Sequence, residues 1–255
     1  MWNVNGYEEF STERIQPSID LATRVMQIKP EINSILDIGC GSGLSTSVLK
    51  KLWHNAEITG MDLSIDMLEK ARNTLPGINF ILKDCSTATD LIGSYDLIFS
   101  NAFLQWASNQ KLFIQNIKSN LSDNGILAMQ IPNYENMPVA KCVQKTTASF
   151  RKLLSREPET SCFTYDPSDY YNMFASCYSY IEMWETNYFH QMKNQMDILS
   201  FISTTALAPY LDVLEKKYHK QFKECVLYYI KQAYPSQENG IVLFPFKHIF
   251  VTAWK

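Results

Sequence analysis

The chain has 255 residues, of which 46% are hydrophobic and 19% are charged. This composition allows one domain over residues 1–255 with a full buried core. The net charge of −3 at pH 7 argues against nucleic acid or an anionic membrane as the main partner, so neither is expected. The first residues lack the basic and apolar parts of an export signal, and no apolar run reaches about 18 residues. We therefore expect a cytoplasmic protein.

The cysteines are scattered, and they form no C-x-x-C pair and no cluster with histidine. This pattern is typical of reduced, mostly buried thiols in a cytosol, and it favours neither disulfides nor a metal site. No metal is therefore expected. The cysteines are Cys40, Cys85, Cys142, Cys162, Cys177 and Cys225.

Residues 1–33 are predicted to form an N-terminal helical cap. Ser11 can begin a helix, and apolar residues then recur with helical spacing up to about Ile28. Arg14 lies in the first turns of this helix. Its spacing alone does not distinguish an exposed helix charge from a residue that binds a carboxylate at the mouth of a site.

A strand that turns sharply into a helix is predicted for residues 34–53. The strand reaches Ile38, the loop reads Gly39-Cys40-Gly41-Ser42-Gly43, and apolar residues recur with helical spacing from Leu44 onward. Gly39 permits a tight turn, and Gly41 lets a ligand approach bare backbone. Turns of this kind bind nucleotide-like ligands, although a glycine-rich turn without a ligand remains an alternative.

The spacing of the loop distinguishes between such ligands. It reads G-x-G-x-G, whereas the dinucleotide fingerprint is G-x-G-x-x-G and a phosphate loop ends in Gly-Lys-Ser/Thr. Asp37, just before the turn, suits a ligand with a cationic amino group better than a pyrophosphate. S-adenosylmethionine has that group, together with a ribose and an adenine, and it has no phosphate. An NAD-dependent dehydrogenase is the alternative if the spacing misleads.

Two further acids lie at predicted strand ends. Asp62 ends the strand 57–62, about 20 residues beyond the loop, where a carboxylate can accept hydrogen bonds from both ribose hydroxyls. Asp84 follows the strand 78–82 and is placed to reach an adenine edge. Each acid alone would be an ordinary loop carboxylate. Three at successive strand ends indicate one cofactor site.

Strands and helices alternate over residues 34–134, which we expect to form the cofactor-binding core. Such alternation gives a parallel sheet with its ligand at the carboxyl ends of the strands. The remaining elements of this core are helices from Ser64 to about residue 75 and near 109–120, and strands at 95–100 and 125–131.

The alternation stops after Tyr134. Residues 135–178 and 194–240 are predicted to be helical insertions, with prolines marking their breaks. Between and after them lie the final strands, 180–192 and 246–254. We expect the insertions to form a lid over the site.

The order of the glycine loop and the strand-end acids resembles the class I S-adenosylmethionine-dependent methyltransferases. Several narrower segments resemble the trans-aconitate methyltransferase family, and the likeness runs nearly from end to end. These segments are Phe10-Ser11-Thr12-Glu13-Arg14, Leu104-Gln105-Trp106, His190-Gln191-Met192, Tyr234-Pro235 and Phe246 to Ala253.

The resemblance implies an α/β fold with a doubly wound, mostly parallel seven-stranded sheet and an added helical lid. It also implies methyl transfer from S-adenosylmethionine to a carboxylate of a small polycarboxylic acid, giving a monomethyl ester. A carboxylate is already ionised at pH 7, so no residue is expected to act as a general acid or base. A small anionic acid is thus the expected substrate, and no obligate protein partner is indicated.

The resemblance also implies the residues of the site. The expected cofactor-binding residues are Asp37, Gly39, Gly41, Asp62, Leu63, Asp84, Cys85 and Asn101. Gln105, Trp106, Arg14 and His190 are expected to position the reacting groups. The substrate-binding candidates are Tyr7, Arg14, Trp106, Tyr134, Tyr188, His190 and Lys247.

Two positions depart from the family pattern, which has arginine where this chain has Gln16 and Lys247. Both changes remove a planar fork suited to carboxylates, so a different acid substrate is an open alternative. The malonyl-carrier-protein methyltransferase of biotin synthesis is a second alternative within the same fold. A binding module that keeps the cofactor pocket without catalysis is a third.

Overall fold

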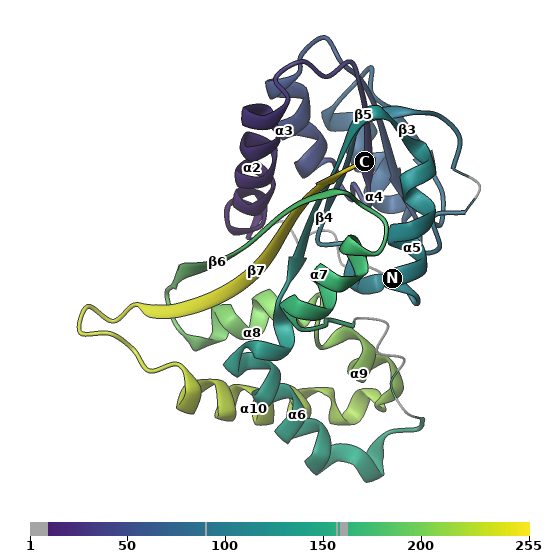
Figure 1. Cartoon of the computed structure of the whole chain (residues 1–255). Coiled ribbons are helices and arrows are strands. Elements are labelled where there is room, and N and C mark those ends of the chain that lie inside the picture. Colours follow the sequence, from purple (N-terminus) through teal and green to yellow (C-terminus); the bar gives the residue numbers. More distant parts are fainter. Residues whose placement is uncertain (1–9, 90, 157, 159–162) are drawn as a thin grey trace.

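The computed structural model describes residues 10–89, 91–156, 158 and 163–255. A twisted sheet runs through the molecule with helices on both of its faces, and a separate group of helices lies beyond one end of the strands (Figure 1). None of the helices in these ranges is long and apolar enough to cross a membrane.

The sheet has seven strands in the order β3-β2-β1-β4-β5-β7-β6. The five strands from β3 to β5 are parallel, whereas β7 is antiparallel to both β5 and β6. The expected α/β sheet of seven strands is therefore present, and it is mixed. The strands are β1 Ser34–Ile38, β2 Glu57–Asp62, β3 Asn79–Leu82, β4 Tyr95–Asn101, β5 Leu121–Pro132, β6 Tyr180–Met192 and β7 Val242–Trp254.

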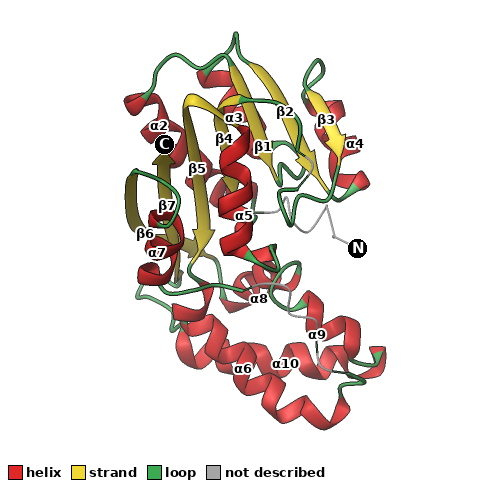
Figure 2. Cartoon of the chain, turned by 45° about the vertical axis from the view of Figure 1, so that its right-hand side comes forward, coloured by secondary structure: helices red, strands yellow, loops and turns green. Residues whose placement is uncertain are grey.

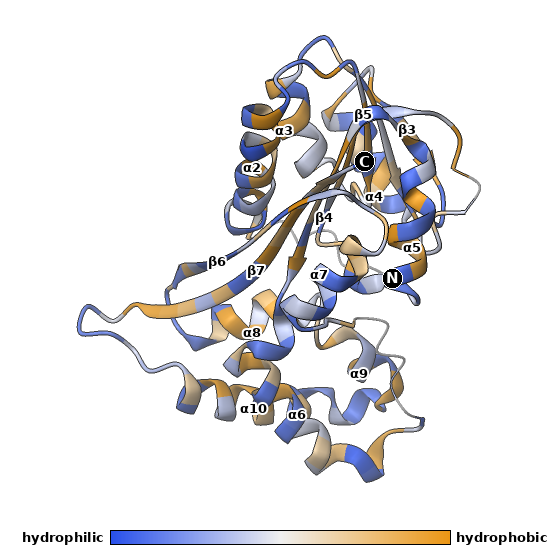
Figure 3. Ribbon diagram, viewed as in Figure 1, coloured by the Kyte–Doolittle hydropathy of each residue, from blue (hydrophilic) through white to orange (hydrophobic). Residues whose placement is uncertain are grey.

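Helices cover both faces of the sheet. The first face carries α2 and α3, whose buried residues Leu21, Val25 and Leu49 pack on strand residues such as Phe99. The second face carries α5 and α7, which contribute Phe113 and other buried residues. Figure 3 shows hydrophobic and hydrophilic stretches alternating along α2 and α3, as expected of helices with one face on a core. The helices around the sheet, α4 included, have the bounds α2 Ser11–Ile28, α3 Leu44–Leu52, α4 Ile65–Thr74, α5 Gln110–Ile117 and α7 Pro167–Ala175.

Local capping explains where two of these helices begin. The Ser64 hydroxyl accepts a hydrogen bond from the Met67 backbone N–H at the start of α4. The Asn109 side chain accepts one from the Leu112 N–H at the start of α5. Such caps satisfy N–H groups that the first helical turn leaves without partners, so the helices begin next to the strand ends that line the site.

Apart from α7, the helices of the two insertions form a helical layer with its own core. Its buried residues include Val143, Phe150, Ile202 and Phe222. This layer lies beyond the end of β5 (Figure 2). Its helices are α6 Pro138–Phe150, α8 Gln195–Ser203, α9 Ala208–Val213 and α10 Lys216–Ala233. The role of this layer as a lid over the site stays a prediction.

Two strands begin earlier than the sequence predicts. The strand expected from 125 begins at Leu121, and the one expected from 246 begins at Val242. Pro245 has no N–H to donate, which normally excludes proline from an inner strand. The pairing of β7 with β5 starts only at His248, so Pro245 has a strand neighbour on one side alone and is tolerated.

Candidate active site

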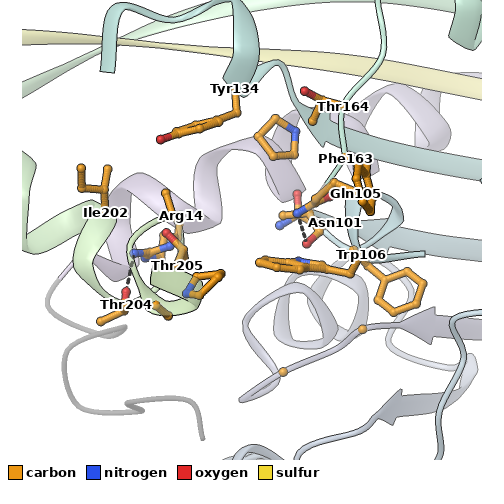
Figure 4. A pocket seen from close by; sticks show the side chains of 18 of the residues that line it. Arg14, Asn101, Gln105, Trp106, Tyr134, Phe163, Thr164, Ile202, Thr204 and Thr205 are labelled. Atoms are coloured by element: carbon orange, nitrogen blue, oxygen red, sulfur yellow. Dashed lines mark hydrogen bonds between the residues drawn. The ribbon is translucent and has the colours of Figure 1, made fainter. Parts of the chain in front are cut away.

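A cavity of about 900 Å³ lies at the carboxyl ends of the parallel strands, between the sheet and the helical layer. One part is lined by the glycine loop and the ends of β2, β3 and β4. The other part is lined by α2, the ends of β5 to β7 and residues of the helical layer (Figure 4). Ligands of open α/β sheets bind at this edge of the strands.

The glycine loop borders the cavity with its backbone. The Gly39 and Cys40 N–H groups donate to the Met61 carbonyl oxygen at 2.8 and 3.1 Å, which joins the loop to β2. Gly39 has a φ of +71°, and a Cβ there would come within 2.6 Å of the Phe103 ring. A Cβ at Gly41 would meet no atom within 4 Å, so this glycine leaves open space that a ligand can fill.

The carboxylate of Asp62 is fixed at the end of β2. Its Oδ2 accepts a hydrogen bond from the Gly41 N–H at 2.9 Å, and its Oδ1 accepts one from the Ser64 N–H at 2.8 Å. Leu63 follows on the cavity wall with 69% of its surface exposed. An exposed leucine beside a fixed carboxylate is the arrangement expected for a nucleoside, with an apolar surface for its base and an acceptor for its ribose.

Asp84 and Cys85 line the cavity at the end of β3, and Asn101 lines it at the end of β4. Asp84 accepts a hydrogen bond from the Ser86 N–H at 2.9 Å, whereas the Cys85 thiol is buried and its pKa is raised by desolvation to about 12. The structure thus brings seven of the eight expected cofactor residues to one cavity.

Asp37 is the exception, because it is buried and does not line the cavity. Its Oδ2 accepts hydrogen bonds from the Ser45 and Thr46 hydroxyls at 2.8 and 2.6 Å. Its Oδ1 has no partner among the described residues. Burial raises the carboxyl pKa from 3.8 to about 6, and the two hydroxyls partly oppose that rise.

Substituting Asp37→Asn is expected to raise the free energy of unfolding above about pH 6. In the wild type the unfolded chain binds fewer protons than the folded one between pH 3.8 and about 6, so wild-type stability falls as the pH rises through this window. A shift of roughly two pKa units corresponds to about 3 kcal/mol. Urea denaturation at several pH values measures the difference. If the difference in the free energy of unfolding between the wild type and Asp37→Asn does not change with pH, the prediction is wrong.

The turn after β4 supplies Gln105 and Trp106, and both line the cavity. Ala102 has a φ of +55°, a left-handed conformation that turns the chain back toward the site. Gln105 donates from Nε2 to the Ala102 carbonyl at 2.6 Å. The backbone carbonyl of Gln105 accepts a hydrogen bond from the Phe163 N–H at 2.7 Å, which brings Phe163 to the cavity wall.

Arg14, Tyr134 and His190 line the part of the cavity away from the glycine loop. Arg14 donates from Nη2 to the Phe201 carbonyl at 3.1 Å, and its guanidinium lies 4.3 Å from the centre of the Phe201 ring. Burial lowers the pKa of His190, which favours its neutral form. In Figure 4 Arg14, Tyr134 and Trp106 surround the same open space.

Two expected substrate residues lie outside the cavity lining, and Tyr7 lies outside the described residues. The Tyr188 hydroxyl donates to Asp20 at 2.5 Å, so this side chain joins β6 to α2. The Lys247 ammonium pairs with Glu185 at 3.7 Å. Both side chains thus make contacts between elements, and their role in substrate binding stays a prediction.

His248 and Gln130 line the cavity and were missed in the sequence, as was Arg156. Strand geometry could have indicated His248. Successive side chains of a strand point to opposite faces, so Lys247 and His248 cannot both face the site. Phe246, two residues before His248, lines the cavity as well.

Comparison with known proteins identifies the family. Residues 31–177 match the family model described as a methyltransferase domain. A protein of Rhodopseudomonas palustris named trans-aconitate 2-methyltransferase is 34% identical, and the match covers 100% of this chain and 99% of that protein. A protein of Escherichia coli with the same name is 30% identical, and the match covers 99% of this chain and 97% of that protein.

Solved structures support the fold alone. The YcgJ protein of Bacillus subtilis superposes with a TM-score of 0.60 and 13% identity over 94% of this chain and 98% of that one. The plantazolicin methyltransferase BpumL superposes with a TM-score of 0.52 and 16% identity over 98% of this chain and 88% of that one. The full-length relatives and the family model show that the chain belongs to the trans-aconitate methyltransferase family and is an S-adenosylmethionine-dependent methyltransferase.

Proposed function

We propose that the enzyme methylates a carboxylate of a small polycarboxylic acid, and that this acid is trans-aconitate. The main support is the match to relatives of that name over their full length. An arginine in the cavity wall, Arg14, is the charged group that such an acid requires. The expected product is a monomethyl ester.

The cavity fits the cofactor on the side of the glycine loop. The open space at Gly41 accommodates the methionine part, and the fixed carboxylate of Asp62 can accept hydrogen bonds from ribose hydroxyls. Asp84 with Cys85 would border the adenine, and Asn101 would lie near the methionine part. Asp37 would act on the ammonium group only through its charge, because it does not line the cavity.

The reaction requires that the acid be positioned against the methyl group, and it requires no proton transfer from the acid. The bound sulfonium supplies an activated methyl group, and an ionised carboxylate is already a nucleophile. The protein then has to hold the acid in line with the methyl group, exclude water and bind the carboxylates that do not react. Arg14, Gln105 and Trp106 come from two elements that meet at the cavity, as this task requires.

The two departures from the family pattern carry little weight against this substrate. Gln16 is exposed and donates to Asp20, and Lys247 pairs with Glu185. Neither residue lines the cavity.

A panel of acceptors tests the proposal. We expect purified enzyme with S-adenosylmethionine to methylate trans-aconitate at a higher kcat/KM than citrate, cis-aconitate or malonate, with mass spectrometry identifying a monoester. Higher turnover of a malonyl thioester would favour the carrier-protein alternative. Binding of S-adenosylhomocysteine without methylation of any acceptor would favour a binding module.

A further inference from the structure

We propose that His248 binds a carboxylate of the acceptor through its Nε2–H group, and that Gln130 is the positioning residue that fixes this ring. The inference rests on the proposed carboxylic acid substrate and assigns a further binding group to it. It starts from two polar side chains that line the cavity and have no role among the expected site residues. His248 is 7% exposed and Gln130 is 1% exposed, so both are buried.

The two side chains meet where the inner strands end. Gln130 lies near the carboxyl end of β5, and its backbone carbonyl accepts a hydrogen bond from the Ala102 N–H at 3.0 Å. His248 lies on β7 opposite Pro132, the last residue of β5. This end of the sheet lies beside the turn that carries Gln105 and Trp106, so His248 borders the space where the methyl acceptor must lie.

The hydrogen bond between them determines the tautomer of the ring. The Gln130 amide donates from Nε2 to Nδ1 of His248, so Nδ1 is an acceptor and the ring proton is on Nε2. The hydrogen bond of the His248 ring to the described residues is at Nδ1, whereas the ring borders the cavity and its Nε2–H is left for a ligand. A ligand acceptor would satisfy this donor.

Aromatic rings hold the imidazole in place. The Tyr188 ring lies 5.2 Å from it in an edge arrangement, and the Phe246 ring lies 5.0 Å from it. Tyr188 is itself held by its hydrogen bond to Asp20. A donor in a rigid surround loses little conformational entropy when it binds a ligand.

The electrostatic surroundings keep the ring neutral. Burial, with a smaller contribution from His190 on β6, lowers the pKa of His248 to about 3. Glu13 and Arg14 on α2 act in turn on His190. His248 is thus a neutral donor throughout the working pH range, whereas Arg14 supplies positive charge. This combination favours an acid whose carboxylates are held by a cation and by neutral donors.

The test begins with His248→Phe, which keeps an aromatic ring among Tyr188 and Phe246 but removes both nitrogens. We expect KM for the acid to rise roughly tenfold or more, as for loss of a hydrogen bond to a charged group. The dissociation constant of S-adenosylhomocysteine should stay within about twofold. His248→Gln, which retains an amide donor, should recover part of the lost affinity. His54→Phe, at an exposed turn, is the matched control and should change neither value.

Gln130→Leu should raise KM less than His248→Phe does, and KM of the double variant should be no higher than that of His248→Phe alone.

Gln130→Glu places a carboxylate at Nδ1, so the ring donates from Nδ1 and the proton leaves Nε2. We expect KM of Gln130→Glu to become dependent on pH and to fall as the ring protonates, whereas the wild-type value stays flat. Nitrogen-15 NMR of His248 should show an unprotonated Nδ1 in the wild type.

The outcomes separate this inference from the proposed function. Wild-type enzyme that methylates no acid in the panel overturns the proposed function, and the inference fails with it. Turnover by the wild type with an unchanged KM in folded His248→Phe overturns the inference alone. Additive effects of the Gln130→Leu and His248→Phe substitutions, or a protonated Nδ1 in the wild type, overturn the positioning role of Gln130.

Discussion

Replacing Asp62 with alanine should raise the dissociation constant of the cofactor by roughly tenfold or more. The carboxylate would accept hydrogen bonds from the ribose, and charge-assisted bonds of this kind contribute about 1.5–3 kcal/mol. Asp62 also fixes the loop, because its two oxygens accept the Gly41 and Ser64 N–H groups. Calorimetric titration with S-adenosylhomocysteine measures the change.

Two further variants separate the two roles of Asp62. Asp62→Asn keeps an oxygen acceptor for one of the two N–H groups and loses the charge, so an intermediate dissociation constant is expected. Glu57→Ala changes an exposed acid at the opposite end of the same strand and should leave cofactor binding as in the wild type. An unchanged dissociation constant in Asp62→Ala would remove this residue from the cofactor site.

The cofactor side of the cavity could be predicted because its signals are local in the sequence. Each strand end is followed directly by its loop, so the positions of Asp62 and Asp84 in the chain also give their positions at the sheet edge. Asp37 shows the limit of this argument. It lies within β1 and not after its end, and its carboxylate is used by two hydroxyls of the following helix.

The acceptor side could be predicted only in part, because it is assembled from elements that are far apart in the chain. The family resemblance gave Tyr188 and Lys247 as candidates, but their contacts to Asp20 and Glu185 could be known only from the packing of α2, β6 and β7. Strand alternation would have been a better guide here, because it separates Lys247 from its neighbour His248, which lines the cavity.

The sequence also could not predict which part of the helical insertions reaches the cavity. Their apolar periodicity predicts helices, and helices are present, yet periodicity does not say which loop crosses the site. Phe163 reaches the cavity wall because its N–H and carbonyl bond to Gln105 and Gln110. Those bonds join positions more than 50 residues apart, as the 53-residue separation between Gln110 and Phe163 shows. No local pattern carries that information.

Substituting Arg14→Ala should raise KM for the acid by roughly 10- to 100-fold, because a charge-assisted hydrogen bond contributes about 1.5–3 kcal/mol to binding. Cofactor affinity should change little, since Arg14 lies across the cavity from the glycine loop. Initial rates at saturating S-adenosylmethionine measure KM, and titration with S-adenosylhomocysteine measures the cofactor affinity. Arg14→Lys keeps the charge but not the planar fork, so an intermediate KM is expected.

Arg24, on the same helix, separates binding from stability. Its guanidinium pairs with Glu182 at 2.6 Å outside the cavity, where an exposed ion pair contributes little to stability. Arg24→Ala should therefore lower the melting temperature slightly and leave KM unchanged. Arg14 also joins α2 to the Phe201 carbonyl, so Arg14→Ala should lose stability as well. If Arg14→Ala lowers only the melting temperature and KM stays within about twofold, Arg14 connects helices and does not bind the acid.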